Sequence, residues 1–181
     1  MKKIILCILI TLFLITGCEH NTFYSIFNDK DTTAHLVRMR GNRLSGGICL
    51  TELDAQKFEK KGQISYSLFV VYAGPFFINI NPGKSLVLVV DGQHYEISGR
   101  GSESYRNILS VGLVEEKAYY HDIDPDFIRH LAHAKKIEVE ILGSTSVVKR
   151  HFEEKNLSNL KEFCDHYIDI DYDNGLPLTL K

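Results

Sequence analysis

Apolar and polar residues alternate along most of the chain after residue 33, and many of the apolar positions are β-branched or aromatic. A period of two places successive side chains on opposite faces, so this pattern predicts β-strands. Val37 and Met39, for example, should share one face of their strand. The expected strands cover residues 34–40, 64–72, 85–90, 94–98, 106–120, 137–142 and 147–152.

Glycine and proline residues mark the turns between these segments. Asp91-Gly92 separates two of the expected strands, and this dipeptide favours the type I′ turn of a hairpin. Pro75 and Pro82 lie between the strands expected at 64–72 and 85–90, so residues 76–80 should form at most a short or edge strand. Gly112 is expected to form a bulge in the middle of one long strand.

Two segments in the last third of the chain have the period of a helix. Asp124-Pro125-Asp126 is typical of a helix start, with an N-cap, a proline in the first turn and an acid near the positive end of the dipole. This helix should run to about Lys135, and a last helix should begin near Asn156 or Ser158. Its expected apolar stripe is Leu157, Leu160, Phe163, Cys164 and Tyr167.

The order of these elements indicates the fold class. Six or seven strands at short spacing favour a sandwich or barrel over alternating β-α units. The expected fold is therefore mainly β (α+β by content), an antiparallel β-sandwich or curved sheet with two short helices in the C-terminal third. The section 124–167 looks like the closing part of several exported β-rich bacterial modules, a resemblance that implies no particular activity.

The first residues differ from the rest of the chain. Lys2 and Lys3 precede an apolar run from Ile4 to Ile15. About a dozen apolar residues are too few to span a bilayer of ~30 Å as a helix, but they suit a signal peptide.

The run ends in Leu14-Ile15-Thr16-Gly17-Cys18, which resembles the lipobox of bacterial lipoprotein precursors. The resemblance implies cleavage after Gly17 and lipid on Cys18, and hence a membrane anchor in the cell envelope. Glu19, where an Asp would retain the protein in the inner membrane, implies the periplasmic face of the outer membrane if the cell is Gram-negative. The expected organisation is a signal peptide at 1–17, a lipidated N-terminus and tether at 18–33, and one globular β-rich domain at 34–181.

Composition narrows the class of partner. Removing 17 residues from 181 leaves 164, the size of one domain, and removing Lys2 and Lys3 changes the formal charge from −2 to −4. No basic stripe points to nucleic acid. The expected partners are the membrane, through the lipid, and an unknown protein or envelope component.

Cys49 and Cys164 are the two cysteines that remain in the expected globular domain. An even pair in an exported chain favours one disulfide, and the alternative is two buried thiols.

Two clusters of side chains are candidate metal sites. Asp169, Asp171 and Asp173 resemble the first half of a calcium loop, but Leu180 stands where the closing Glu would be. His130 and His133 lie three apart on the first expected helix, where both could hold one metal ion. Neither cluster is complete, so no metal, no cofactor and no catalytic residue is assigned.

The function that fits best is a non-enzymatic binding or interaction module. The aromatic residues suggest a binding surface, because tyrosine is common at interfaces. One alternative is an envelope hydrolase that uses the region from His121 to His133, and another is a carrier of an apolar ligand with a cavity inside the sheet. The aromatic residues considered are Tyr66, Tyr72, Phe76, Phe77, Tyr95, Tyr105, Tyr119 and Tyr120.

Overall fold

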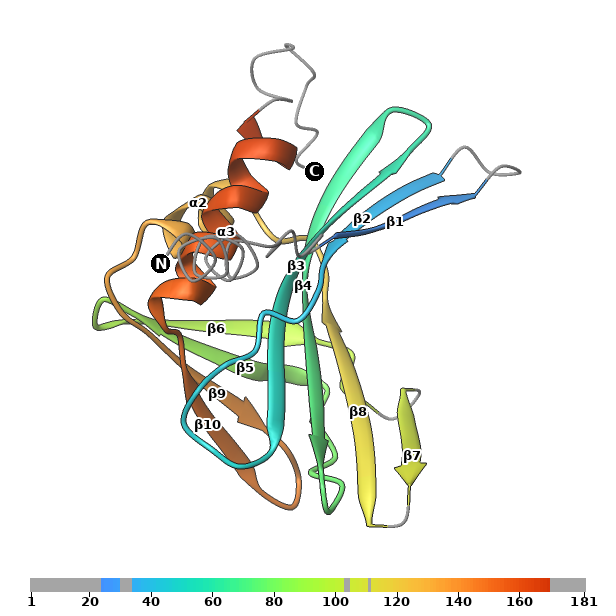
Figure 1. Ribbon diagram of the computed structural model, residues 1–181, viewed down its shortest axis with the longest axis vertical. Coiled ribbons are helices and arrows are strands. Elements are labelled where there is room, and N and C mark those ends of the chain that lie inside the picture. The colour runs from blue at the N-terminus through green and yellow to red at the C-terminus, as the bar shows by residue number, and fades with distance from the viewer. Residues whose placement is uncertain (1–23, 30–33, 103–104, 111, 170–181) are drawn as a thin grey trace, which may run out of the picture.

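The computed structural model describes residues 24–29, 34–102, 105–110 and 112–169, and its ribbon is drawn in Figure 1. They form two antiparallel sheets and two helices, so the expected mainly β fold with two C-terminal helices is confirmed. The six-stranded sheet has the order β1-β2-β3-β4-β8-β7, and the four-stranded sheet has the order β10-β9-β5-β6. The strands are β1 (Tyr24–Asp29), β2 (Ala34–Met39), β3 (Leu50–Lys60), β4 (Gln63–Gly74), β5 (Gly83–Val90), β6 (Gln93–Gly99), β7 (Arg106–Ser110), β8 (Leu113–Tyr120), β9 (Ile137–Leu142) and β10 (Val147–His151).

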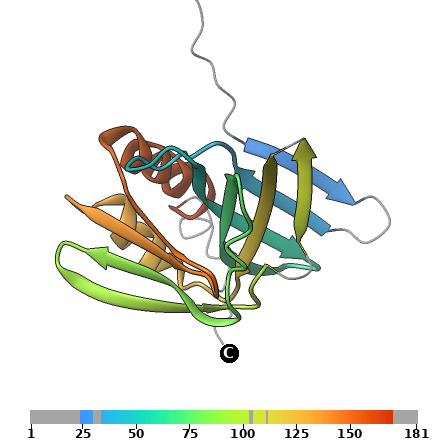
Figure 2. The ribbon, with the colours of Figure 1, turned by 90° about the horizontal axis from the view of Figure 1, so that it is seen from below.

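One face of the larger sheet is covered by two neighbours. The helices α2 (Pro125–Ala132) and α3 (Glu154–Tyr167) lie against its upper part in Figure 1, and the four-stranded sheet lies against its lower part. Figure 2 shows the same two sheets from below, with β5, β6, β9 and β10 on one side of the molecule. A single apolar core joins all of these layers.

Alternation decides which side chains enter this core. In β4, Tyr66, Leu68, Val70 and Tyr72 are buried on the face toward the helices. Val37 and Met39 of β2 are buried on the same side, as their spacing predicts. Burying a side chain of this size stabilises the fold by roughly 1.5–3 kcal/mol, so these strands supply much of its stability.

The local signals for turns and caps are confirmed. Asp91 and Gly92 both have positive φ angles, of 49° and 89°, as a type I′ turn requires. The Asp124 side chain accepts a hydrogen bond from the Asp126 N–H at 2.8 Å and caps α2. Helix α2 ends at Ala132, earlier than expected. The Asp91 carboxylate accepts the N–H groups of Lys135 and Lys136, at 3.0 and 2.8 Å.

Three strands differ from the expectation. β1 lies in the segment expected to be a tether and pairs with β2. β3 spans residues whose mixed polarity predicts no strand. Both faces of β3 are covered between Leu53 and Lys57, so polar as well as apolar side chains are buried there. The single strand expected at 106–120 is a hairpin instead, since Gly112 has a φ of 82° and forms the turn between β7 and β8.

Candidate functional site

Among the described residues, β7 is the last strand of the six-stranded sheet, so one of its sides is an open edge (Figure 1). The Lys117 N–H donates to the Tyr105 carbonyl at 3.0 Å, which directs the backbone of residue 105 toward β8. Successive residues of an antiparallel strand direct their backbone groups to alternate sides. The N–H and C=O groups of Arg106 and Ile108 therefore point away from β8, where another strand could bind them.

Large apolar side chains surround this open strand. Ile108 is 71% exposed, Leu109 50% and Leu113 46%. Phe76 is 77% exposed and lies two residues after Gly74, the last residue of β4. Val114 of β8 pairs with Gly74 on one side and with Ile108 of β7 on the other. Monomeric proteins seldom gather so many exposed apolar side chains unless the surface makes a contact. We refer to Phe76, Ile108, Leu109 and Leu113 as the apolar edge.

A buried carboxylate holds the loop that carries Phe76. Glu116 of β8 is fully buried and accepts hydrogen bonds from the N–H groups of Ile78, Asn79 and Ile80, the last two at 3.0 Å. The Ser102 hydroxyl donates to the same carboxylate. Four donors to one carboxylate explain how a charged group can be stable in the core. The loop next to the apolar edge is thereby fixed.

Arg106 joins this loop to the open strand. Its guanidinium donates to the Asn79 side-chain oxygen at 2.8 Å and lies 5.8 Å from the Phe77 ring centroid. Asn79 has a φ of 54°, and its N–H is one of the donors to Glu116. The apolar edge is therefore presented by a strand and a loop that are bonded to one another.

An arginine and several aromatic rings occupy the face of the larger sheet that is turned away from the helices. The Arg38 guanidinium lies 4.1 Å from the Phe69 ring centroid and donates to the Tyr119 hydroxyl at 3.3 Å. Tyr119 also contacts the ring of Tyr105, which precedes β7. These contacts link the open edge to the centre of the sheet.

A buried acid lies on the same face of the larger sheet. Asp54 of β3 is 2% exposed and accepts the Asn42 N–H at 3.0 Å. Burial raises the pKa of Asp54 to about 7, although this hydrogen bond acts in the opposite direction. The Asn42 side chain donates to the Leu53 carbonyl and accepts from the amide of Asn156 in α3. This polar chain connects the larger sheet to the last helix, which is a structural role.

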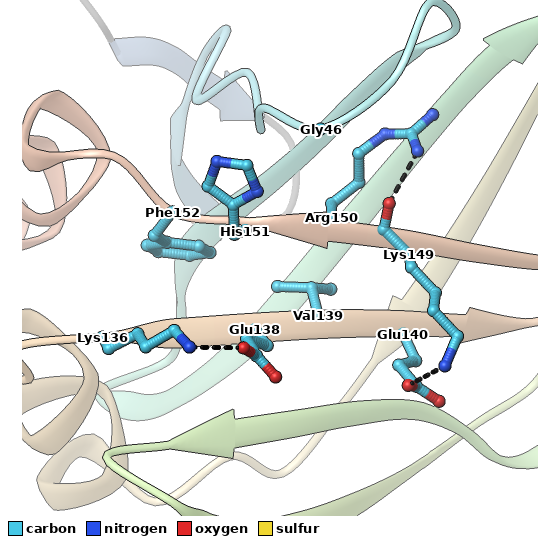
Figure 3. A pocket seen from close by; sticks show the side chains of 9 residues that line it. All are labelled: Gly46, Lys136, Glu138, Val139, Glu140, Lys149, Arg150, His151 and Phe152. Atoms are coloured by element: carbon cyan, nitrogen blue, oxygen red, sulfur yellow. Dashed lines mark hydrogen bonds and ion pairs between the residues drawn. The ribbon is translucent and has the colours of Figure 1, made fainter.

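The pocket in Figure 3 offers a second surface, of about 640 Å³, on β9 and β10. Its charged side chains bind one another. Lys136 pairs with Glu138 and Lys149 with Glu140, both at 2.6 Å, and the Lys136 hydrogen bond lowers the pKa of Glu138. Arg150 donates to the Lys149 carbonyl. A ligand would have to break these ion pairs, so we consider the apolar edge the stronger candidate.

The histidines considered for a hydrolase or a metal site do not converge. His121 stacks on Tyr119 with ring centroids 5.8 Å apart. The His130 Nε2 lies 3.2 Å from the Tyr95 hydroxyl, and the His133 Nδ1 lies 2.9 Å from the Arg129 carbonyl. Within the described part of the chain, no three His, Cys, Asp or Glu residues are grouped as metal ligands.

The acidic C-terminal segment is described only at its start. Asp169 accepts a hydrogen bond from the Arg129 guanidinium at 2.7 Å, so this carboxylate pairs with a cation of α2. Asp171 and Asp173 lie outside the described residues.

The expected disulfide between Cys49 and Cys164 is not present, since both thiols are free in the described residues. Near the start of α3, Asn156 donates to Asn42, whose side chain bonds to the Leu53 carbonyl of β3. At the end of α3, the Tyr167 carbonyl accepts the hydroxyl of Tyr66, the residue that pairs with Lys57 of β3. Helix α3 therefore runs along β3 in the same direction. Cys49 precedes the start of β3, and Cys164 lies near the end of α3.

The distance between the two thiols follows from this arrangement. Cys164 is level with β3 residues at least five positions beyond Cys49, and five strand residues span roughly 16 Å. A disulfide requires Cα atoms within about 7 Å. Cys164 is buried, which raises its pKa to about 12, and the Cys49 Sγ lies 3.8 Å from the Tyr72 hydroxyl.

The aromatic residues expected at a surface divide into three groups. Tyr66, Tyr72 and Tyr120 are core residues, whereas Phe76 and Tyr105 are exposed. The others are partly buried, namely Phe77, Tyr95 and Tyr119. Ile108 and Leu109 are not among the residues expected at a binding surface, because two apolar residues in an alternating segment are typical of a buried strand. The useful signal was Gly112, since a glycine after a short apolar segment can form a turn and leave an edge strand.

Comparison with protein-family models, curated proteins and solved structures finds no match for this chain. None of the helices in the described residues has the length and apolar character needed to cross a membrane. The site is therefore interpreted from its own geometry.

Proposed function

We propose that this chain is an exported, lipid-anchored envelope protein that acts as a non-enzymatic binding module, and that the apolar edge is its binding surface. The observation that carries this proposal is the exposure of Ile108 and Leu109 on a strand whose other side is open. Strand addition satisfies such backbone groups, and apolar side chains supply affinity. The membrane location rests on the lipobox-like sequence before Cys18.

The geometry gives less support to an enzyme. A hydrolase would need a pocket that joins His121, His130 or His133 to a carboxylate with a perturbed pKa. The hydrogen-bond partners of His130 and His133 are a tyrosine and a backbone carbonyl. Asp54, whose pKa is raised, bonds to the backbone of Asn42 instead.

The Cys18→Ser variant tests the anchor. It should lose labelling by radioactive palmitate and move from the membrane fraction to the soluble fraction, because the thiol that would carry the lipid is removed. A Cys49→Ser variant, which leaves Cys18 intact, should keep both properties. Persistent palmitate labelling of Cys18→Ser would rule out the lipoprotein assignment.

A photo-crosslinking amino acid at Ile108 tests the binding surface in cells that make the full chain. We expect discrete covalent adducts after illumination, because a partner strand would lie within reach of this side chain. Position 147 is the matched control, since Val147 is 48% exposed at the end strand of the other sheet. The proposal is contradicted if position 108 gives no adduct, or only the products seen at position 147.

A further inference from the structure

We propose that the occupant of the apolar edge is a second copy of this chain, bound through antiparallel pairing of β7 with β7. This inference rests on the binding role proposed above for the same surface. A two-fold axis through such a contact presents the same patch on both copies, so the patch must complement itself. The backbone, the charges and the area of this edge each meet that requirement.

The backbone of β7 can pair with its own copy. The N–H and C=O groups of Arg106 and Ile108 point to the open side, as derived from the bond between Lys117 and Tyr105. With Ile108 opposite Ile108 of the second copy, the two residues exchange both backbone hydrogen bonds. The six-stranded sheets then become one continuous sheet, and the two Ile108 side chains meet at the axis, while each Leu109 lies opposite Asn107 of the second copy.

The charges at this edge do not oppose the contact. Arg106 is the only charged residue of β7, and in this register it lies opposite Ser110 of the second copy. The two arginines are then separated by about four residues, or roughly 13 Å. On β8, Glu116 is fully buried, and Glu115 and Lys117 pair with each other at 2.5 Å. β7 pairs regularly with β8 from Arg106 to Ile108, and its register shifts only between Ile108 and Ser110.

The exposed area fits a weak, reversible dimer. A fully covered aromatic side chain accounts for roughly 150–250 Å², so the four residues of the apolar edge expose on the order of 500 Å² in each copy. Complete coverage of these side chains in both copies would bury at most about 1,000 Å², near the lower limit for a specific interface. Covalent trapping is therefore a better assay than isolation of an intact dimer.

Ile108→Cys in the full chain tests the register. Opposed residues in a hydrogen-bonded antiparallel pair have Cα atoms about 5.5 Å apart, which suits a disulfide. After mild oxidation of cells, we expect a disulfide-linked dimer that contains both of two differently tagged copies. Asn107→Cys is the matched control, because in this register residue 107 faces Leu109 of the second copy and not itself. Its dimer yield should be at least tenfold lower, and the unsubstituted chain should show the background from its own cysteines.

A second variant separates pairing from random collision. Leu109→Lys added to Ile108→Cys should lower the dimer yield about tenfold, because it replaces an apolar side chain that lies against the second copy with a charged one, while the circular dichroism spectrum stays unchanged. Equal yields for Ile108→Cys and Asn107→Cys, or no effect of Leu109→Lys, would overturn the inference. Adducts at position 108 that contain only other proteins would overturn it as well, while leaving the proposed function intact. The absence of any adduct in the photo-crosslinking experiment would overturn both.

Discussion

Glu116→Ala is expected to destabilise the protein by about 4 kcal/mol or more. The Glu116 carboxylate is fully buried, and the N–H groups of Ile78, Asn79 and Ile80 and the Ser102 hydroxyl all donate to it. Its removal leaves four donors without an acceptor, and each buried donor left unsatisfied costs roughly 1–3 kcal/mol. Water entering the new cavity offsets part of this cost, which is why the expected total lies below the simple sum.

Urea unfolding followed by circular dichroism measures this effect, with two comparison variants. Glu116→Gln keeps the volume but loses the charge and one acceptor oxygen, so it should lose roughly 1.5–3 kcal/mol. Glu115→Ala changes the adjacent residue, whose salt bridge with Lys117 is partly exposed, and should cost less than about 1 kcal/mol. A Glu116→Ala protein as stable as Glu115→Ala would show that the carboxylate does not anchor the loop.

The stability of the protein should also fall as the pH rises from about 4 to about 7, because of Asp54. Burial raises its pKa from the ordinary value of 3.8 to about 7 in the folded protein. Between these values the folded state holds a proton that the unfolded state has released. Stability from this group is therefore complete below pH 4 and is lost as the pH rises through 7. An interval of about three pH units at about 1.4 kcal/mol each corresponds to on the order of 4 kcal/mol.

Asp54→Asn isolates this contribution, because the amide resembles the protonated acid and can still accept the Asn42 N–H. The free energy of unfolding, measured by urea titration from pH 4 to pH 8, should decline less steeply in the variant than in the unsubstituted protein. Glu138→Gln is a control of opposite sign. Lys136 lowers the pKa of Glu138, so its contribution is present at neutral pH and is lost as the pH falls. Parallel curves for Asp54→Asn and the unsubstituted protein would refute the raised pKa.

The features that could be predicted from sequence are those with a local cause. The type I′ turn at Asp91-Gly92 follows from the φ angles that these two residues tolerate, and the cap at Asp124 follows from a side chain that reaches its own helix. Val37 and Met39 are buried together because a strand has a period of two. The mainly β fold class follows from many such segments with short connections.

The candidate site depends on contacts between distant residues. A glutamate in an alternating segment is expected to face water, and Glu116 is stable in the core only because donors 14 to 38 residues away reach it. The same holds for β7, since nothing within residues 106–110 shows that this strand lies at an edge. Cysteine count favoured a disulfide, but the direction of α3 along β3 separates Cys49 from Cys164. The chain by itself thus determined periods, turns and caps. Strand order, helix direction and the partners of buried charges were decided by the tertiary structure, because they depend on which distant surfaces pack together.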